Sequence, residues 1–170
     1  AILFVGDLAG YSHKGGLEVA RSIARLRTPA LVVPGNHDAA NALQMAAEVL
    51  EADVLLPLLN RGQRAREREL ASALGPARVA GYSVHTLETE RGPLDVIAGR
   101  PHSAGGAHLA FRPYLAEAFG VTDMEASARK LCALVDESRA EDLVFLAHNG
   151  PSGLGARRDD IWGCDFRKSE

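Results

Sequence analysis

The sequence predicts a single α/β domain with a parallel sheet, and two observations lead to this prediction. An apolar run at residues 2–5 is followed by an amphipathic segment at 17–27 and a second apolar run at 30–33. A strand, a helix and a strand at this spacing form a βαβ unit, whose two strands are parallel. These two runs and a third at 143–147 all lead into Gly, Asp, Asn or His residues. Polar residues at strand ends are typical of α/β folds, whose ligands bind at the carboxyl edge of the sheet.

Length and composition agree with one domain spanning residues 1–170, because a chain of 170 residues buries a substantial core. The hydrophobic content of 46% and the charged content of 24% are ordinary for a globular protein. The formal net charge of -3 argues against a general nucleic-acid binder and against a basic membrane-surface protein. No apolar run approaches the roughly 20 residues that span a bilayer.

Cysteine usage bears on the cellular compartment. Cys132 and Cys164 are the only cysteines, so the chain has no dense disulfide framework, although one disulfide remains an alternative. No secretory segment is visible at the start. We therefore interpret both cysteines as free thiols and expect a cytoplasmic protein, or a plastid protein if a transit peptide has been removed.

The first strand, residues 1–5, is predicted from four consecutive large apolar residues followed by Gly6. A Gly-rich loop at 7–16 allows the backbone to approach a ligand closely. The helix at 17–27 ends before Pro29, which disfavours a helical residue in front of it. Its apolar face comprises Val19, Ile23 and Leu26.

Two helices are predicted next, at residues 41–51 and 61–74, and Gly75-Pro76 ends the second. The apolar face of the first comprises Leu43, Ala46, Ala47 and Leu50. The second is rich in arginine and glutamate. We interpret it as a solvated helix face, with contact between its basic side chains and a phosphate group as the alternative.

The second half begins with a hairpin over residues 78–98, predicted from two β-rich runs that flank a Gly-Pro turn. A helix at 108–119 is interrupted near its start by Pro113. A longer helix at 123–137 begins at Thr122-Asp123-Met124-Glu125, which has the spacing of a capping box. The strand at 143–147 follows.

Polar side chains follow each of the three apolar runs. Asp7 follows the first, Asn36, His37 and Asp38 follow the second, and His148 follows the third. Asn offers a metal an oxygen ligand, His carries a proton near neutral pH, and Asp can orient a His. For Asn-His-Asp alone an ordinary surface turn is the alternative, since turns are rich in Asn and Asp. The recurrence at three strand ends favours a functional site.

A second Gly-rich loop at residues 99–106 contains two further candidates for substrate binding. The guanidinium of Arg100 can pair with phosphate oxygens, and His102 can assist it. Each is equally compatible with an ordinary loop residue.

These residues carry a family resemblance. Gly6-Asp7, Gly35-Asn36-His37-Asp38 and His148 resemble, in order and spacing, the middle three motifs of the calcineurin-like metallophosphoesterases. The run Ala147-His148-Asn149-Gly150-Pro151-Ser152-Gly153-Leu154-Gly155, with Gly99-Arg100-Pro101 upstream, is similar to a subfamily found in cyanobacteria and plants. The resemblance covers most of the chain, and its most specific motif is Gly-Asn-His-Asp.

The resemblance implies an αββα sandwich, which is two packed β-sheets flanked by helices, with two divalent ions at the carboxyl ends of the strands. It implies that Asp7 bridges both ions and that Asn36 and His148 bind the second. A nitrogen ligand such as His148 favours Mn, Fe or Zn over Ca or Mg. His37 would lie over the leaving group and Asp38 would hold His37. The reaction implied is hydrolysis of a small phosphorylated substrate by a hydroxide bound to the dinuclear centre.

The sequence departs from the family pattern in two motifs. The family begins with Asp-x-His on an earlier strand and ends with Gly-His-x-His, and neither string occurs here. Both losses fall at the extremes of the family order, so we expect that the native protein continues beyond both ends. The alternative is a catalytically inactive binding or scaffold module with the same fold. A nucleotide-binding domain is disfavoured, because no phosphate-binding Gly-rich motif follows a strand.

Overall fold

The computed structural model describes residues 1–8, 10, 12–50, 52, 54–104 and 108–150. Cys164 and the Gly-rich segment 151–155 used in the family resemblance lie outside the described residues. Cys132 is an exposed free cysteine.

The first sheet contains three parallel strands in the order β1-β2-β3, formed by Ile2–Phe4, Ala30–Val32 and Arg78–Val79. Helix α1 (His13–Ile23) connects the first two, so the predicted parallel βαβ unit is confirmed. Assigning residues 78–79 to the hairpin was wrong. They form the third strand of this sheet, because their backbone pairs with β2.

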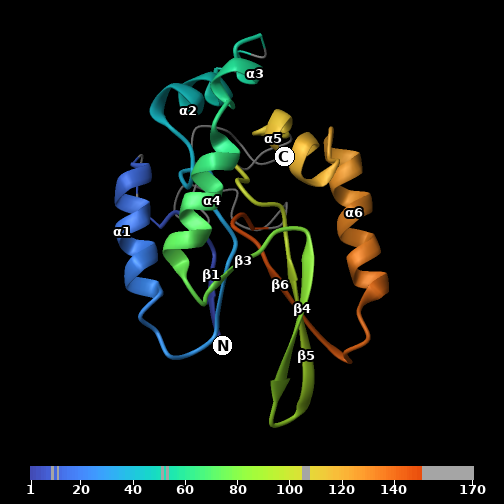
Figure 1. Cartoon of the computed structure of the whole chain (residues 1–170). Helices are drawn as coiled ribbons and strands as arrows, with labels where there is room; N and C mark the ends of the chain where they lie inside the picture. Colours follow the sequence, from blue (N-terminus) through green and yellow to red (C-terminus); the bar gives the residue numbers. More distant parts are fainter. Residues whose placement is uncertain (9, 11, 51, 53, 105–107, 151–170) are drawn as a thin grey trace, which may run out of the picture.

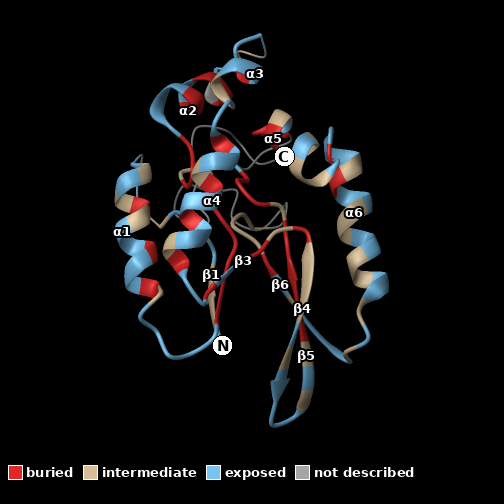
Figure 2. Cartoon of the chain, viewed as in Figure 1, coloured by how far each residue is buried: buried red, intermediate tan, exposed pale blue. Residues whose placement is uncertain are grey.

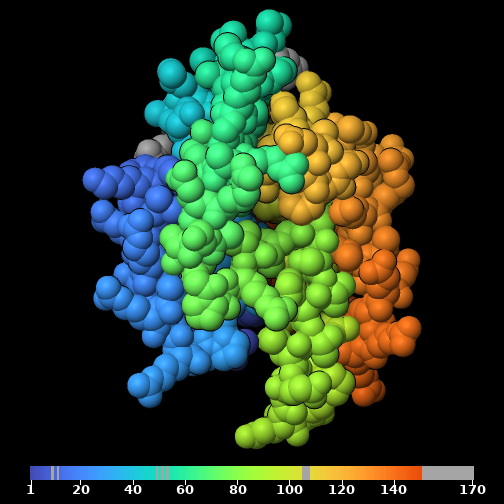
Figure 3. Space-filling model, in the orientation of Figure 1, coloured from blue at the N-terminus to red at the C-terminus, as the bar shows by residue number. Residues whose placement is uncertain are grey.

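The second sheet has the order β4-β5-β6. Strands β4 (Ser83–Thr89) and β5 (Gly92–Ala98) form the predicted antiparallel hairpin, whose far end projects from the molecule (Figure 3). Strand β6 (Asp142–Leu146) pairs with β5 in parallel and matches the predicted strand to within one residue.

The two sheets lie between helices (Figure 1). Helix α1 and helix α4 (Gln63–Leu74) flank one side, and α6 (Met124–Glu137) flanks the other. The chain is therefore α/β with two small sheets and helices, an arrangement compatible with an α/β sandwich.

The side chains of β2 point alternately to the two faces of its sheet, and this alternation explains how the sheet packs against both neighbouring layers. Ala30 and Val32 belong to a buried cluster with residues of α1 and α4, whereas Leu31 and Val33 belong to a cluster with residues of β5 and β6. A strand turns successive side chains to opposite faces, so β2 packs on helices with one face and on the second sheet with the other. Figure 2 shows the buried residues concentrated in these central strands.

Three further helices are α2 (Ala42–Val49), α3 (Leu56–Leu59) and α5 (Arg112–Phe119). Pro113 lies in the first turn of α5, where a missing N–H costs nothing, so it starts this helix rather than interrupting it.

The predicted apolar faces of two helices were wrong in part. Ala47 of α2 is buried as predicted, but Leu43 and Leu50, the residue that caps α2, are 71% and 77% exposed, while Gln44 is fully buried. Ile23 of α1 is also buried as predicted, but Val19 and Leu26, which lies beyond the end of α1, are exposed by more than a third, because the helix packs through Gly16, Ala20 and Ile23. Gln44 can lie on the inner face of α2 because its amide donates hydrogen bonds to Asn60 and Gln63.

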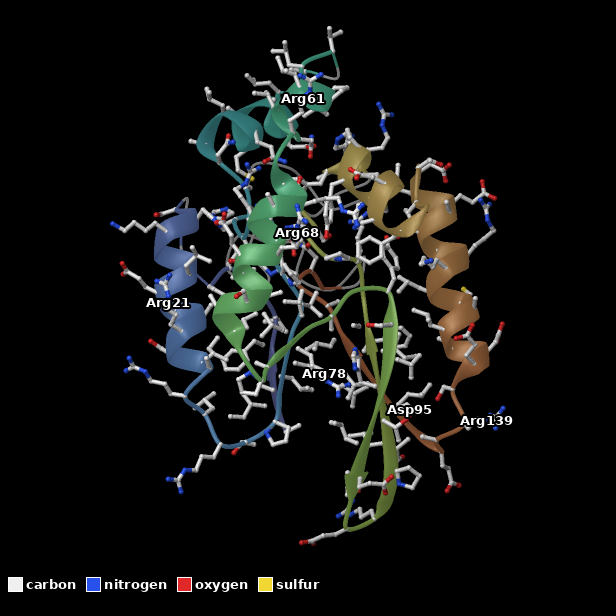
Figure 4. All side chains as sticks on the ribbon, in the orientation of Figure 1. Arg21, Arg61, Arg68, Arg78, Asp95 and Arg139 are labelled. Carbon is white, nitrogen blue, oxygen red and sulfur yellow. The ribbon has the colours of Figure 1, made fainter. Side chains whose placement is uncertain are left out.

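Asp95 of β5 connects three segments of the second half. Its carboxylate accepts hydrogen bonds from Thr86 Oγ1 at 2.6 Å and Ser138 Oγ at 2.6 Å, and from the backbone N–H groups of Arg139 and Ala140. Figure 4 shows Asp95 on its strand and Arg139 beyond the end of α6. Hydrogen bonds from Ser138 and Thr86 lower the pKa of Asp95 from 3.8 to about 2.

We expect Asp95→Asn to lower the thermal midpoint and to flatten its acid dependence. A carboxyl whose pKa is lower in the folded state stabilises the fold above its unfolded pKa, and this contribution is lost as the pH falls from about 4 to about 2. The measurement is thermal unfolding between pH 2 and pH 7, with the exposed Asp142 changed to Asn as the control. Equal acid dependence in parent and Asp95→Asn would contradict the prediction.

Candidate metal centre

Three strand ends bring the predicted metal ligands together. Asp7 follows β1, Asn36 follows β2 and His148 follows β6. The Nε2 atom of His148 lies 3.3 Å from Asp7 Oδ2 and 3.1 Å from Asn36 Oδ1. One nitrogen atom thus contacts two oxygen atoms from different strand ends, and all three side chains are partly exposed.

Two glycines allow this approach. Gly6 has a φ of +90°, and a Cβ atom there would lie 2.2 Å from the backbone nitrogen of Gly35. A Cβ atom on Gly35 would lie 2.2 Å from Asp7 Oδ1 and 2.8 Å from His148 Cε1. Real Cβ atoms do not come so close to other atoms, so only glycine lets the two turns touch through their backbones. Asp7 itself has a φ of +50°, a left-handed conformation that is uncommon outside glycine.

Asp38 joins the same two turns. It is 3% exposed, and its oxygens accept the backbone N–H of Leu8 at 2.9 Å and that of Gly35 at 2.9 Å. Burial raises the pKa of Asp38, and these two hydrogen bonds offset part of that effect. Its hydrogen bonds therefore go to the backbone, and its role in holding the His37 ring stays a prediction.

The ring of His148 is oriented by a backbone carbonyl. Nδ1 lies 2.5 Å from the oxygen of Val5, and a carbonyl only accepts, so Nδ1 carries a proton and donates it. Nε2 then faces Asp7 and Asn36. Metal-binding histidines commonly use this arrangement, in which one ring nitrogen donates to a carbonyl and the other faces the ion.

Asp7 and His148 also form an electrostatic pair. Burial by itself raises the pKa of Asp7, but the hydrogen bond and charge of His148, together with the His37 N–H, lower it overall. Burial by itself lowers the pKa of His148, but the hydrogen bond and charge of Asp7 raise it overall. The pair thus favours an ionised carboxylate, which is the state that binds a cation, and a protonated imidazole, which must release its Nε2 proton before it can bind one.

His37 is half-buried and contributes its backbone to the site. Its N–H donates to Asp7 Oδ1 at 3.1 Å. The turn therefore holds one carboxylate oxygen of Asp7, while His148 contacts the other. The predicted general-acid role of the His37 ring stays a prediction.

The structure separates the two candidates of the second Gly-rich loop. Arg100 donates to Ser103 Oγ at 2.7 Å, and its other terminal nitrogen lies 2.6 Å from Met124 Sδ. Its predicted contact with a phosphate stays a prediction. His102 is fully buried, so of the two alternatives left open for it the structure favours a structural residue over one that assists Arg100 in substrate binding. It pairs with Glu67 and donates from Nδ1 to the oxygen of Gly35 at 3.0 Å.

Sequence reasoning missed Glu67, which it placed on a solvated helix face. Glu67 is 9% exposed, and Leu70 and Leu74 on the same helix are buried. These residues follow Glu67 by three and seven positions, the spacing of one helical face. That spacing was the signal in the sequence from which the burial of Glu67 could have been predicted.

The donor set decides how many ions the site holds. Within the part of the chain that the structure describes, no group of three or more His, Cys, Asp and Glu residues is placed to hold a metal ion. Asp7, His148 and the amide oxygen of Asn36 supply three ligands, which is the number that a catalytic site provides to one ion. These three side chains are therefore a candidate ligand set for one ion, and the predicted second ion would need ligands from outside this set.

Comparison of the chain with protein-family models, with curated proteins and with solved structures finds no match. Among the described residues, no helix has both the length and the apolar character needed to cross a membrane.

Proposed function

We propose that the protein is a metal-dependent phosphoester hydrolase of the calcineurin-like type. The observation that supports this proposal is the convergence of Asp7, Asn36 and His148 from three separate strand ends, with His148 Nε2 within 3.3 Å of both partner oxygens. A mixed set of carboxylate, amide and imidazole donors suits Mn, Fe or Zn. The two sheets between helices are compatible with the fold that the family resemblance implies.

Each residue has a defined task in this proposal. Asp7, Asn36 and His148 bind the divalent ion, and Val5 keeps the His148 ring in the required orientation. Divalent ions at such a site neutralise the phosphate and lower the pKa of a bound water. His37 protonates the departing oxygen. A small phosphorylated substrate approaches from the open edge, where Asp7 is partly exposed.

One observation favours a second candidate, a binding or scaffold module without hydrolysis. Within the described residues the donors fall short of a dinuclear site, and His148 Nε2 already contacts Asp7 and Asn36 directly. In this module the three side chains would connect the strand ends by hydrogen bonds. The two candidates differ in whether a metal is bound.

Metal content tests this difference, and we expect the parent protein to retain at least one Mn ion per chain. The measurement is elemental mass spectrometry after purification with added Mn. His148→Ala is expected to lose the ion, because it removes one of three ligands. His13→Ala is the matched control, since His13 pairs with Glu69 on the helices α1 and α4. A parent protein without bound metal would favour the scaffold module.

Activity is then measured with bis(p-nitrophenyl) phosphate and p-nitrophenyl phosphate, a diester and a monoester. Hydrolysis that requires added Mn and disappears in His148→Ala supports the hydrolase. Bound metal without hydrolysis of either ester would contradict the proposed reaction and leave metal binding standing.

A further inference from the structure

Helix α4 reaches the turn that contains Asn36 at two points. Arg66 donates from Nε to the backbone oxygen of Ala39 at 2.5 Å. The adjacent residue, Glu67, pairs with Nε2 of His102, and Nδ1 of His102 donates to the oxygen of Gly35 at 3.0 Å. Two neighbouring side chains of one helix thus support the carbonyl groups at both ends of the segment 35–39.

The link through His102 is fully enclosed by the protein. His102 is fully buried, and its ring lies 5.4 Å from that of Phe111 and 5.3 Å from that of Tyr114, the second at a nearly perpendicular angle of 86°. The backbone N–H of His102 donates to the backbone oxygen of Pro34 at 2.7 Å, and the residue has a left-handed φ of +56°. A strained backbone and a fully enclosed ring persist only where the surrounding structure determines them.

The link through Arg66 is also oriented by neighbours. Nη2 of Arg66 donates to Gln44 Oε1 at 2.7 Å. The amide nitrogen of Gln44 in turn donates to Asn60 Oδ1 and to Gln63 Oε1. Because Gln44 and Gln63 are fully buried and Arg66 is partly buried, these hydrogen bonds restrict the guanidinium to the Ala39 carbonyl.

We propose that Arg66, Glu67 and His102 are positioning residues that hold the turn 35–39 so that Asn36 faces His148. The turn supplies one ligand directly, and its N–H at His37 holds another, Asp7. Partners behind metal ligands set their orientation, and losing one typically weakens metal binding or activity by about 10- to 100-fold. The part of this inference that concerns Mn affinity rests on the proposed function. The part that concerns how α4 holds the turn does not depend on a bound metal.

The test uses the full chain and two readouts. The first is amide hydrogen exchange of the metal-free protein, followed at Gly35 and His37, whose N–H groups bond to Asp38 and Asp7. The second is the affinity for Mn alone. Two variants remove the contacts of helix α4 with the turn, Glu67→Leu and Arg66→Met, and they are called the clamp variants. Glu67→Gln is the conservative variant, because its amide still bonds to His102. Glu69→Leu is the matched control, two positions along the same helix, where the glutamate is exposed and bonds to His13.

We expect exchange at Gly35 and His37 to quicken about tenfold or more in Glu67→Leu and Arg66→Met, while exchange at Ile97 in the core of β5 keeps its parent rate. Mn affinity is expected to fall about 10- to 100-fold in both variants. Glu67→Gln is expected to keep most of the parent's slow exchange and Mn affinity, and Glu69→Leu is expected to resemble the parent protein. If Glu67→Leu does not fold, Arg66→Met and Glu67→Gln carry the test.

The outcomes separate this inference from the proposed function. A parent protein that binds no Mn overturns the proposed function, and exchange at Gly35 and His37 still decides whether α4 holds the turn. Unchanged exchange in both clamp variants overturns the inference, whatever the metal affinity. Quickened exchange with unchanged Mn affinity in a metal-binding parent also overturns it, because the turn would then not position the ligand.

Discussion

Replacement of His37 by alanine is expected to lower the turnover of phosphoester hydrolysis by about 100- to 10,000-fold, the usual contribution of a general acid. Bound metal per chain is expected to stay at the parent value. The reason is structural: the backbone N–H of His37 donates to Asp7 Oδ1 at 3.1 Å, and alanine keeps that N–H. The measurement pairs kcat with metal content by elemental mass spectrometry.

The leaving group supplies a sharper test of this role. A p-nitrophenolate departs without much help from an acid, whereas a phenolate or an alkoxide needs a proton. The deficit of His37→Ala is therefore expected to be larger for phenyl phosphate than for p-nitrophenyl phosphate. Equal deficits for both esters, or loss of metal from the variant, would show that His37 does not act as the general acid.

Gly35→Ala is expected to disrupt the site and to lower the free energy of unfolding. The new Cβ atom would lie 2.2 Å from Asp7 Oδ1, 2.7 Å from the Asp7 backbone nitrogen and 2.8 Å from His148 Cε1. Relief requires that Asp7 and His148 move away from residue 35, which displaces two of the three proposed metal ligands. Overpacking of a tight site costs roughly 1–3 kcal/mol, and we expect Mn affinity to fall more than the typical 10- to 100-fold of a change behind the ligands.

Gly10→Ala is the control for this variant. A Cβ atom on Gly10 meets nothing within 4 Å, and Gly10 lies in the loop that leads to α1. It is expected to change neither Mn affinity nor the thermal midpoint by much. A Gly35→Ala protein with parent affinity for Mn would mean that the turn and Asp7 are not in contact in solution.

Local patterns predicted the secondary structure of this chain well. Consecutive apolar residues found β1, β2 and β6, and the turn residues between β4 and β5 found the hairpin. The predicted capping box was one residue early, because the N-terminal cap of α6 is Asp123 and not Thr122, and Asp123 accepts the N–H of Ala126. These features depend on residues a few positions apart, so a sequence contains them directly.

The pattern of apolar residues predicted the inner face of a helix less well where that face contains a buried polar residue. The inner face of α2 includes Gln44, and that of α4 includes Gln63 and Glu67. Apolar periodicity does not identify such residues, because burial of a polar side chain depends on a hydrogen-bonding partner elsewhere in the chain. The partner of Glu67 is His102, 35 positions away.

The sequence by itself determined the α/β class, the parallel βαβ unit and the grouping of Asp7 with Asn36, since parallel strands end at a common edge. The recurrence at three strand ends and the family resemblance predicted that His148 joins them, and the tertiary structure decided how closely it approaches and how its ring is oriented. Its ring is oriented by the carbonyl of Val5, 143 positions earlier. The tertiary structure also decided that His102 supports the turn instead of facing a substrate. Strand and helix periodicity act over a few residues, whereas a ligand set depends on how distant strand ends meet when two sheets pack together.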